Sequence, residues 1–203
     1  MLKKLNKITL FAVFSSFLLL SGCALFRTNA TQAPNITIFK NTQISLPSPK
    51  ALDINMTASQ LLTATYNIDN EIKSYTTEVQ VESSSNKITL VAVSGWGGAL
   101  FSLVYDGKSI QSSSLPMPNA NMGIKQTLSD FIFTYASEKV LNTMLLGTGI
   151  QLQQSEDKRI FSQQGKVLMD ISYTPNIHTK NAEVYLRNHL YHYQIKIKTI
   201  ERN

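Results

Sequence analysis

The sequence predicts an α+β domain built on a single curved antiparallel sheet. Three observations support this fold class: segments of strand-like alternation in the first half of the chain, a stretch with apolar residues at helical spacing over 124–146, and a second set of strand-like segments up to the end. The order strands, helices, strands is typical of α+β domains, in which one antiparallel sheet can wrap around the helices.

The chain opens with a bacterial lipoprotein signal peptide over residues 1–22. Three lysines precede an apolar run from Ile8 to Leu20, which is too short and too one-sidedly flanked for a spanning helix. The following Leu20-Ser21-Gly22-Cys23 resembles the lipobox at all four positions. This resemblance implies that Cys23 becomes the acylated first residue, and two or three acyl chains such as palmitate anchor a protein almost permanently. Ala24 stands where Asp would signal retention in the inner membrane, so we expect an anchor in outer-membrane lipid, facing the periplasm.

Charge and cysteine content exclude several classes of function. The formal net charge is +6, and removal of the three signal lysines leaves +3 without a large Lys/Arg cluster, so we expect no nucleic-acid partner. Cys23 is the single cysteine, and its acylation leaves no thiol for a disulfide, a redox motif or a nucleophile.

Residues 23–53 are expected to form a lipidated tether, and residues 54–203 the folded domain. The first segment is rich in Thr, Asn, Gln and Pro, with one short apolar patch at 36–39. Leu46-Pro-Ser-Pro49 predicts a stiff extended piece where the tether meets the domain.

Several strands are expected next. Period-two alternation over 77–82 predicts a strand with one solvated face, and 87–93 and 99–105 are apolar on both faces. Asp106-Gly107 predicts a turn into a strand at 108–113.

The helical stretch Ile124–Leu146 is predicted to form two short helices. Phe131-Ile-Phe-Thr-Tyr135 is a poor helix interior, and Ser137 is a good N-cap for a second helix that ends at Gly147. We expect this stretch to act as a lid whose apolar stripe contacts the sheet and any bound chain. Further strands are predicted at 151–153, 159–163, 166–173 and, as one long strand, 183–201.

Candidate catalytic residues are few, and we expect neither an enzyme nor a metal or cofactor site. His189 and His192 would lie on opposite faces of the predicted last strand, where they cannot chelate one ion and face solvent. His178 lies in a loop without a recognisable acidic partner, and the common hydrolase, zinc-protease and phosphate-loop motifs are absent from the sequence.

Trp96, the single tryptophan, lies among three glycines in Ser94-Gly95-Trp96-Gly97-Gly98, between two apolar strands. Two interpretations remain open. Either the glycines form a bulge and Trp96 folds back into the core, or the hairpin tip holds the indole out towards a membrane interface.

Short motifs follow one another in order over nearly the whole mature domain. They are Leu46-Pro-Ser-Pro49, Gln60-Leu-Leu, Ile88-Thr-Leu-Val-Ala-Val93, Leu100-Phe-Ser-Leu-Val-Tyr-Asp-Gly107, Arg159-Ile160, Ile171-Ser-Tyr173, Leu186-Arg-Asn188 and Tyr193-Gln-Ile-Lys-Ile-Lys-Thr199. The order of elements, with the lipobox and the tether, resembles the LolB-like outer-membrane lipoprotein acceptors and the related periplasmic carrier LolA. The motifs resemble more closely the DUF3261 group of outer-membrane lipoproteins of unknown function, often encoded among aryl-polyene or fatty-acid-like biosynthesis genes.

The resemblance implies a half-open β-barrel of LolA/LolB type, with an apolar concave face, a helical lid and a cavity suited to acyl chains. It places Ser94-Gly95-Trp96-Gly97 where LolB-like proteins carry an exposed apolar hairpin residue, so Trp96 is a candidate membrane-contact residue. The candidate cavity residues, any of which can equally be plain core, are Val79, Leu90, Phe101, Leu103, Leu128, Phe131, Ile171 and Leu186.

The sequence therefore favours a lipoprotein that binds or relays a hydrophobic acyl-like molecule (a lipid, a lipoprotein acyl chain or a polyene product), with a LolA-like carrier as a candidate partner. The alternative is a structural or assembly lipoprotein with a filled core that binds a protein. A third hypothesis, an enzyme acting on a lipid-linked product, has only the histidines in its favour. An interior empty enough for a chain supports the first hypothesis, and native packing density throughout opposes it.

Overall fold

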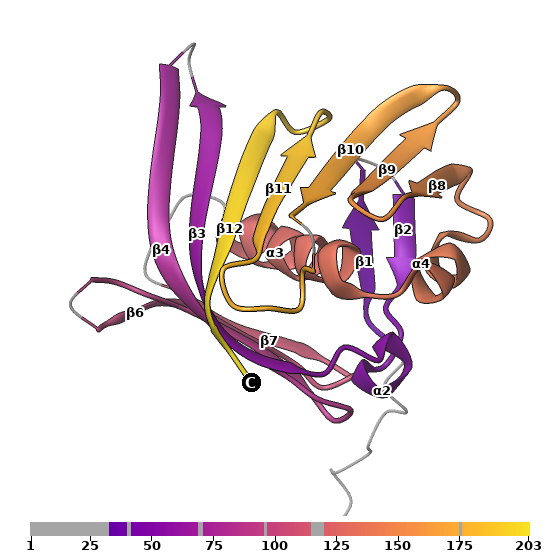
Figure 1. Cartoon of the computed structure of the whole chain (residues 1–203). Helices are drawn as coiled ribbons and strands as arrows, with labels where there is room; N and C mark the ends of the chain where they lie inside the picture. The colour runs from indigo at the N-terminus through magenta and orange to yellow at the C-terminus, as the bar shows by residue number, and fades with distance from the viewer. Residues whose placement is uncertain (1–32, 40–41, 69–70, 96, 115–119, 175) are drawn as a thin grey trace, which may run out of the picture. The chain divides into compact units, whose positions relative to one another are not determined.

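Ten strands form one antiparallel sheet in the computed structural model (Figure 1). The structure describes residues 33–39, 42–68, 71–95, 97–114, 120–174 and 176–203, which belong to one compact unit, Gln32–Asn203. Across the sheet the strands are β7 (Ile110–Ser114), β6 (Ala99–Tyr105), β5 (Ile88–Val93), β4 (Glu71–Ser83), β3 (Met56–Ile68), β12 (Tyr193–Arg202), β11 (Glu183–Asn188), β10 (Lys166–Tyr173), β9 (Lys158–Gln163) and β8 (Ile150–Gln154).

The sheet consists of two meanders joined by one long-range pairing. Strands β3 to β7 and β8 to β12 each follow chain order, and β12 pairs with β3 to join the two sets. The strands at the two edges are β7 and β8, so the sheet is not closed into a barrel. In Figure 1, β6 and β7 run at a large angle to β10 and β11, which shows how strongly the sheet curves. The predicted α+β class with a single curved antiparallel sheet is confirmed.

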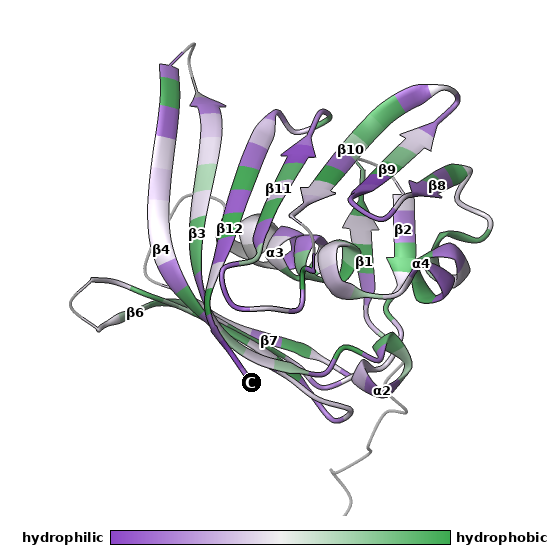
Figure 2. Cartoon of the chain, viewed as in Figure 1, coloured by the Kyte–Doolittle hydropathy of each residue, from purple (hydrophilic) through white to green (hydrophobic). Residues whose placement is uncertain are grey.

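Alternation of side chains gives the sheet one buried face. Apolar and polar residues alternate along β11 and β12 (Figure 2), and in β11 Val184, Leu186 and Asn188 are buried. Residues that oppose each other in antiparallel register share a face, so Leu186 lies with Ile171 on one side and Ile195 on the other. This buried face is the concave one, against which the helix α3 packs.

The helical stretch forms two helices, as predicted. Helix α3 spans Ala120–Tyr135 and α4 spans Glu138–Leu145. The N-cap of α4 is Ser137, whose hydroxyl accepts a hydrogen bond from the Val140 amide at 3.3 Å. Every residue of α3 from 128 to 134 is buried, which requires neighbours on all sides of the helix.

The folded unit begins at Gln32 rather than at residue 54, which differs from the expected tether boundary. Strands β1 (Asn35–Ile38) and β2 (Thr42–Ser45) form a separate hairpin, and the short helix α2 (Pro49–Leu52) follows. Phe39 is buried, and its ring stacks on Phe133 of α3 with centroids 5.7 Å apart. The hairpin thus covers a side of α3 that the sheet leaves open.

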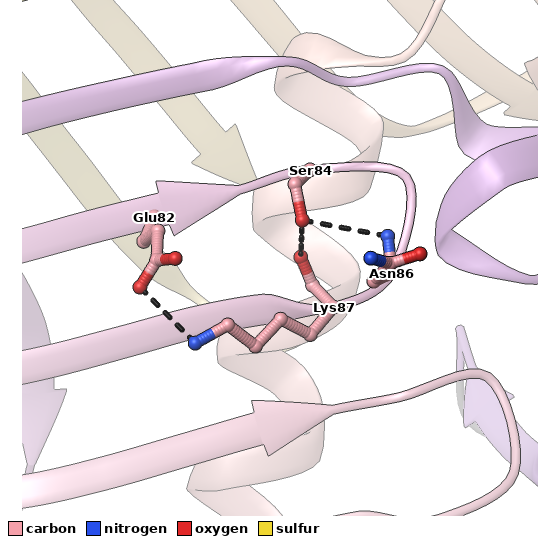
Figure 3. A network of polar contacts seen from close by, with 4 residues as sticks. All are labelled: Glu82, Ser84, Asn86 and Lys87. Atoms are coloured by element: carbon pink, nitrogen blue, oxygen red, sulfur yellow. Dashed lines mark hydrogen bonds and ion pairs between the residues drawn. The ribbon is translucent and has the colours of Figure 1, made fainter.

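Side chains close the turns between neighbouring strands. The predicted turn at Asp106-Gly107 is confirmed: the Asp106 carboxylate accepts hydrogen bonds from the amides of Lys108 and Ser109 at 2.8 and 2.7 Å. At the β4–β5 turn, the Ser84 hydroxyl bonds the Lys87 carbonyl, and the Lys87 ammonium lies 3.3 Å from Glu82 (Figure 3). Exposed pairs of this kind contribute little stability, so these contacts mainly fix the turn.

The prediction of one long last strand over 183–201 is wrong. A turn at residues 189–192 divides it into β11 and β12, and His192 has a φ of +55°. The Asn188 side-chain oxygen accepts hydrogen bonds from the amides of Leu190 and Tyr191 at 3.1 and 2.9 Å. Asn favours such turns because its side chain substitutes for a backbone acceptor.

Candidate functional site

The residues expected to line a cavity lie mainly in a packed core. Seven of them are buried in one hydrophobic cluster together with the β1–β2 hairpin, and Phe101 lies partly exposed at its margin. The seven are Val79, Leu90, Leu103, Leu128, Phe131, Ile171 and Leu186. Around these residues the interior is filled by protein side chains.

Beyond this core, the same concave face carries apolar side chains that remain partly exposed. We call Leu62, Tyr66, Tyr75, Phe101 and Ile195 the distal apolar face. The register puts them on one surface: Ala64 opposes both Tyr75 and Ile195, and Tyr66 opposes Tyr193. Tyr75 is 60% exposed and Tyr66 is 38% exposed, while the other three are half-buried. Solvated aromatic side chains next to a buried apolar surface are typical of binding sites.

The C-terminal end of α3 is held by a buried cation. Arg159 of β9 donates from Nη1 to the carbonyls of Phe133 and Thr134 at 2.7 and 2.9 Å, which would otherwise lack partners at the helix end. Its Nε donates to the Gln154 side chain at 2.6 Å, and its guanidinium lies 5.6 Å from the Tyr173 ring centroid. A positive charge at a helix C-terminus is also favoured by the helix dipole.

A buried carboxyl group faces the sheet from the middle of α3. Asp130 accepts hydrogen bonds from the Tyr193 hydroxyl at 2.8 Å and from the Gln126 amide at 2.9 Å. Burial raises the pKa of Asp130 to about 7, against the lowering effect of these two donors. The carboxyl group therefore holds a proton over much of the acidic range.

A pocket of about 220 Å³ opens where α3 ends. It lies between the helix end, the β8–β9 and β10 strands and the loop after β10, and its lining includes Tyr135, Gln154, Arg159, Tyr173, Asn176 and His178. Pockets for drug-sized ligands are usually about 300–1,000 Å³, so this one suits a small polar group rather than an acyl chain.

The histidines have partners that the sequence did not reveal. His189 lies in the β11–β12 turn, not in a strand, and its Nε2 contacts the Asp170 carboxylate at 2.5 Å. The Nδ1 atom of His178 lies 2.9 Å from an Arg202 guanidinium nitrogen. Within the part of the chain that the structure describes, no group of three His, Cys, Asp or Glu side chains could hold a metal ion.

Two sequence-predicted residues, Cys23 and Trp96, lie outside the described residues. The loop that carries Trp96 is a tight connection between β5 and β6: the Ser94 amide donates to the Gly98 carbonyl at 2.8 Å, and the Gly97 amide donates to the Ser94 carbonyl at 2.8 Å. Methyl groups placed on Gly95 or Gly97 would meet nothing within 4 Å, so this backbone projects away from the packed domain.

Among the described residues, no helix combines the length and the apolar character needed to cross a membrane.

Comparison with known proteins identifies a family. The model for proteins of unknown function DUF3261 matches residues 57–201. No protein of curated function matches the chain significantly in sequence. Among solved structures, a domain described as an outer membrane lipoprotein-sorting protein from Vibrio parahaemolyticus is similar, with 10% sequence identity and a TM-score of 0.36 over 76% of this chain and 88% of that one.

Proposed function

This chain belongs to the DUF3261 family of proteins of unknown function, and we propose that it is an outer-membrane lipoprotein that binds or relays a hydrophobic, acyl-like molecule on the periplasmic side. Its ligand class comprises lipids, lipoprotein acyl chains and polyene products, and its role is binding rather than catalysis. The lipobox ending at Cys23, followed by Ala24, supports the anchor and its location.

The distal apolar face carries this proposal. Tyr66 and Tyr75 lie on the same face of the sheet as the buried core residues, yet they remain 38% and 60% exposed. An acyl chain laid along this face would remove apolar area from water at about 25 cal/mol per Å². The face also continues into the core through Phe101, so a bound chain would extend an existing apolar surface.

Trp96 and Cys23 would place this face near the membrane. Acyl chains on Cys23 hold the protein at the bilayer, and an indole at the β5–β6 tip is a favourable interfacial anchor. Phe101 belongs to β6, the strand that follows this tip. A chain leaving the bilayer or a LolA-like carrier would therefore meet the tip before the distal apolar face.

Matched tyrosine variants test the binding site. Tyr75→Ser removes an exposed ring from the concave side, whereas Tyr185→Ser removes a ring that is 44% exposed on β11, next to the inward-facing Leu186 and so on the opposite side. With a fluorescent fatty acid as the probe, we expect Tyr75→Ser to weaken binding and Tyr185→Ser to leave it unchanged. Equal affinities of wild type and both variants would reject this face as the site.

A second function is favoured by the filled core. Seven of the expected cavity residues are buried in one cluster, which is the property of a structural or assembly lipoprotein that binds a protein partner. In that case no fatty acid would bind the wild-type protein, and the distal apolar face would be covered by the partner instead.

A further inference from the structure

We propose that the pocket at the C-terminal end of α3 is a binding site for a small oxyanion, namely the phosphate or carboxylate group of a ligand. This site shares no residue with the distal apolar face, so the inference goes beyond the proposed function. It rests on Arg159, on the donors around it and on the size of the pocket.

Arg159 lines the pocket with a guanidinium group that has hydrogen-bond donors to spare. The residue is only 8% exposed. Its Nη1 and Nε atoms bond Phe133, Thr134 and Gln154, whereas Nη2 has no hydrogen-bond partner among the described residues. A guanidinium can only donate, so this remaining edge is open to an acceptor in the pocket. The acceptors that Arg159 bonds are all neutral, so its charge is paired with no carboxylate among the described residues, and a charge removed from water is costly unless it is paired.

Arg202 determines which ring nitrogen of His178 carries the proton. The Arg202 guanidinium donates to Nδ1 of His178 at 2.9 Å and to the Ile177 carbonyl at 3.4 Å. Since guanidinium nitrogens never accept, Nδ1 must be the unprotonated nitrogen, and Nε2 then carries the proton. Nε2 of His178, a residue that lines the pocket, is therefore an N–H donor. Burial and the charges of Arg202 and Arg159 lower the pKa of His178, which indicates a positive potential around it.

Tyr135 offers a third donor. Tyr135 lines the pocket, and its hydroxyl oxygen accepts a hydrogen bond from the Gln60 amide at 2.7 Å, so the hydroxyl proton remains free to be donated to another acceptor. Glu156 is a lining carboxylate, and it is exposed and makes no ion pair among the described residues. Glu138 also acts on the charge of Arg159, although it does not line the pocket. Of the charged groups that do line the pocket, the guanidinium of Arg159 is buried and the carboxylate of Glu156 is solvated, so an anion would bind on the Arg159 side.

The size of the pocket fits a head group and not a chain. A volume of about 220 Å³ can hold a phosphate or carboxylate with a few atoms attached, and it is below the usual range for larger ligands. The anion can come from a free small molecule or from the head group of an amphiphile. Both share the chemistry of an oxyanion that accepts from a guanidinium fork.

Titration of the full-length protein in non-ionic detergent tests the site. The probes are inorganic phosphate, acetate and dihexanoyl phosphatidic acid, with dihexanoylglycerol as the uncharged control. We expect saturable binding of at least one oxyanion and none of the control, together with a rise of the His178 pKa measured by NMR, since a bound anion stabilises the imidazolium. Tighter binding of phosphatidic acid than of phosphate would assign the site to a lipid head group, and equal binding would assign it to a free anion.

Variants distinguish loss of anion binding from loss of the fold. Arg159→Gln should abolish binding, and it also weakens the end of α3. His178→Ala changes an exposed loop residue, so it should keep the fold and bind the anion about tenfold more weakly, as expected for one hydrogen bond to a charged group. His192→Ala, in the β11–β12 turn, should have no effect.

The proposal is overturned if no oxyanion binds saturably, or if His178→Ala binds as tightly as wild type and its pKa signal in the wild-type protein is unmoved by the anion. Tyr75→Ser should leave anion binding intact. Loss of fatty-acid binding in that variant therefore reports on the proposed function alone, and the two proposals can fail separately.

Discussion

Asp130 illustrates how one buried residue couples stability to pH. The carboxyl group has a pKa of about 7 in the fold, because burial disfavours its charged form, and about 3.8 when unfolded. A raised folded pKa gives stability that is fully present below the unfolded pKa and is lost as pH rises through the folded pKa. The difference corresponds to about 4 kcal/mol between pH 4 and pH 7, at 1.36 kcal/mol per pH unit.

We predict that Asp130→Asn removes this loss. Its melting temperature should exceed that of wild type by a margin that grows as pH rises from about 4 to about 7 and then stays constant. Asp106→Asn is the matched control, for which the pH dependence has the opposite sign. Hydrogen bonds from the backbone amides of Ser109 and Lys108 lower the pKa of Asp106, so the stability that its carboxylate contributes is lost at low pH. Parallel melting profiles for wild type and Asp130→Asn would contradict the account.

Trp96 is the residue whose role depends most on exposure. We predict that Trp96→Ala leaves the melting temperature nearly unchanged, whereas truncation of a buried tryptophan costs about 3–5 kcal/mol. Tryptophan emission reports the same property, since the chain has a single tryptophan. A blue shift on addition of liposomes is expected, and emission that is already blue and does not move would place the indole in the core.

At the scale of elements, α3 is a core helix in its C-terminal half and not only a lid. Leu128 is fully buried between the sheet and the rest of the cluster. We predict that Leu128→Ala costs the roughly 2–5 kcal/mol of a well-packed site, measured by denaturant unfolding. Lys125→Ala, at an exposed position of the same helix, should cost less than about 0.5 kcal/mol. A small loss at Leu128 with reduced fatty-acid binding would restore the lid interpretation.

The elements that the sequence predicted well are those with a strong local pattern. Strands β6 and β10 occur at the predicted residues, because apolar runs bounded by turn residues specify them. The turn at 189–192 was missed because its signal, the side chain of Asn188, is a hydrogen-bond acceptor that resembles an ordinary polar strand residue in the sequence. The roles of Arg159 and Asp130 depend on partners 25 and 63 residues away, and no local pattern reveals such pairs.

At the scale of the whole molecule, the β1–β2 hairpin completes the core. Apart from the short apolar patch at 36–39, the segment is polar and proline-rich, and its apolar residues find their partners only in the tertiary structure, so it was predicted to be a tether. Phe39 packs on Phe133, and Phe133 packs on Phe161 with ring centroids 4.9 Å apart.

We predict that removal of residues 33–53 exposes these rings and prevents cooperative unfolding, as measured by calorimetry. Ile38→Ala, a milder change at a fully buried position of β1, should lower the free energy of unfolding by about 2–5 kcal/mol. Thr37→Ala, the exposed neighbour, is the control. A truncated protein that melts like the full-length one would show that the hairpin is only a tether.

The central claim is that a hydrophobic ligand occupies the distal apolar face. Mass spectrometry of compounds that co-purify with the native full-length protein, extracted gently from the membrane, tests it most directly. The account predicts an acyl-type molecule at a near-stoichiometric level in the wild-type protein and clearly less in Tyr75→Ser purified in parallel. A wild-type protein that carries no more hydrophobic compound than an unrelated lipoprotein from the same membrane would contradict it.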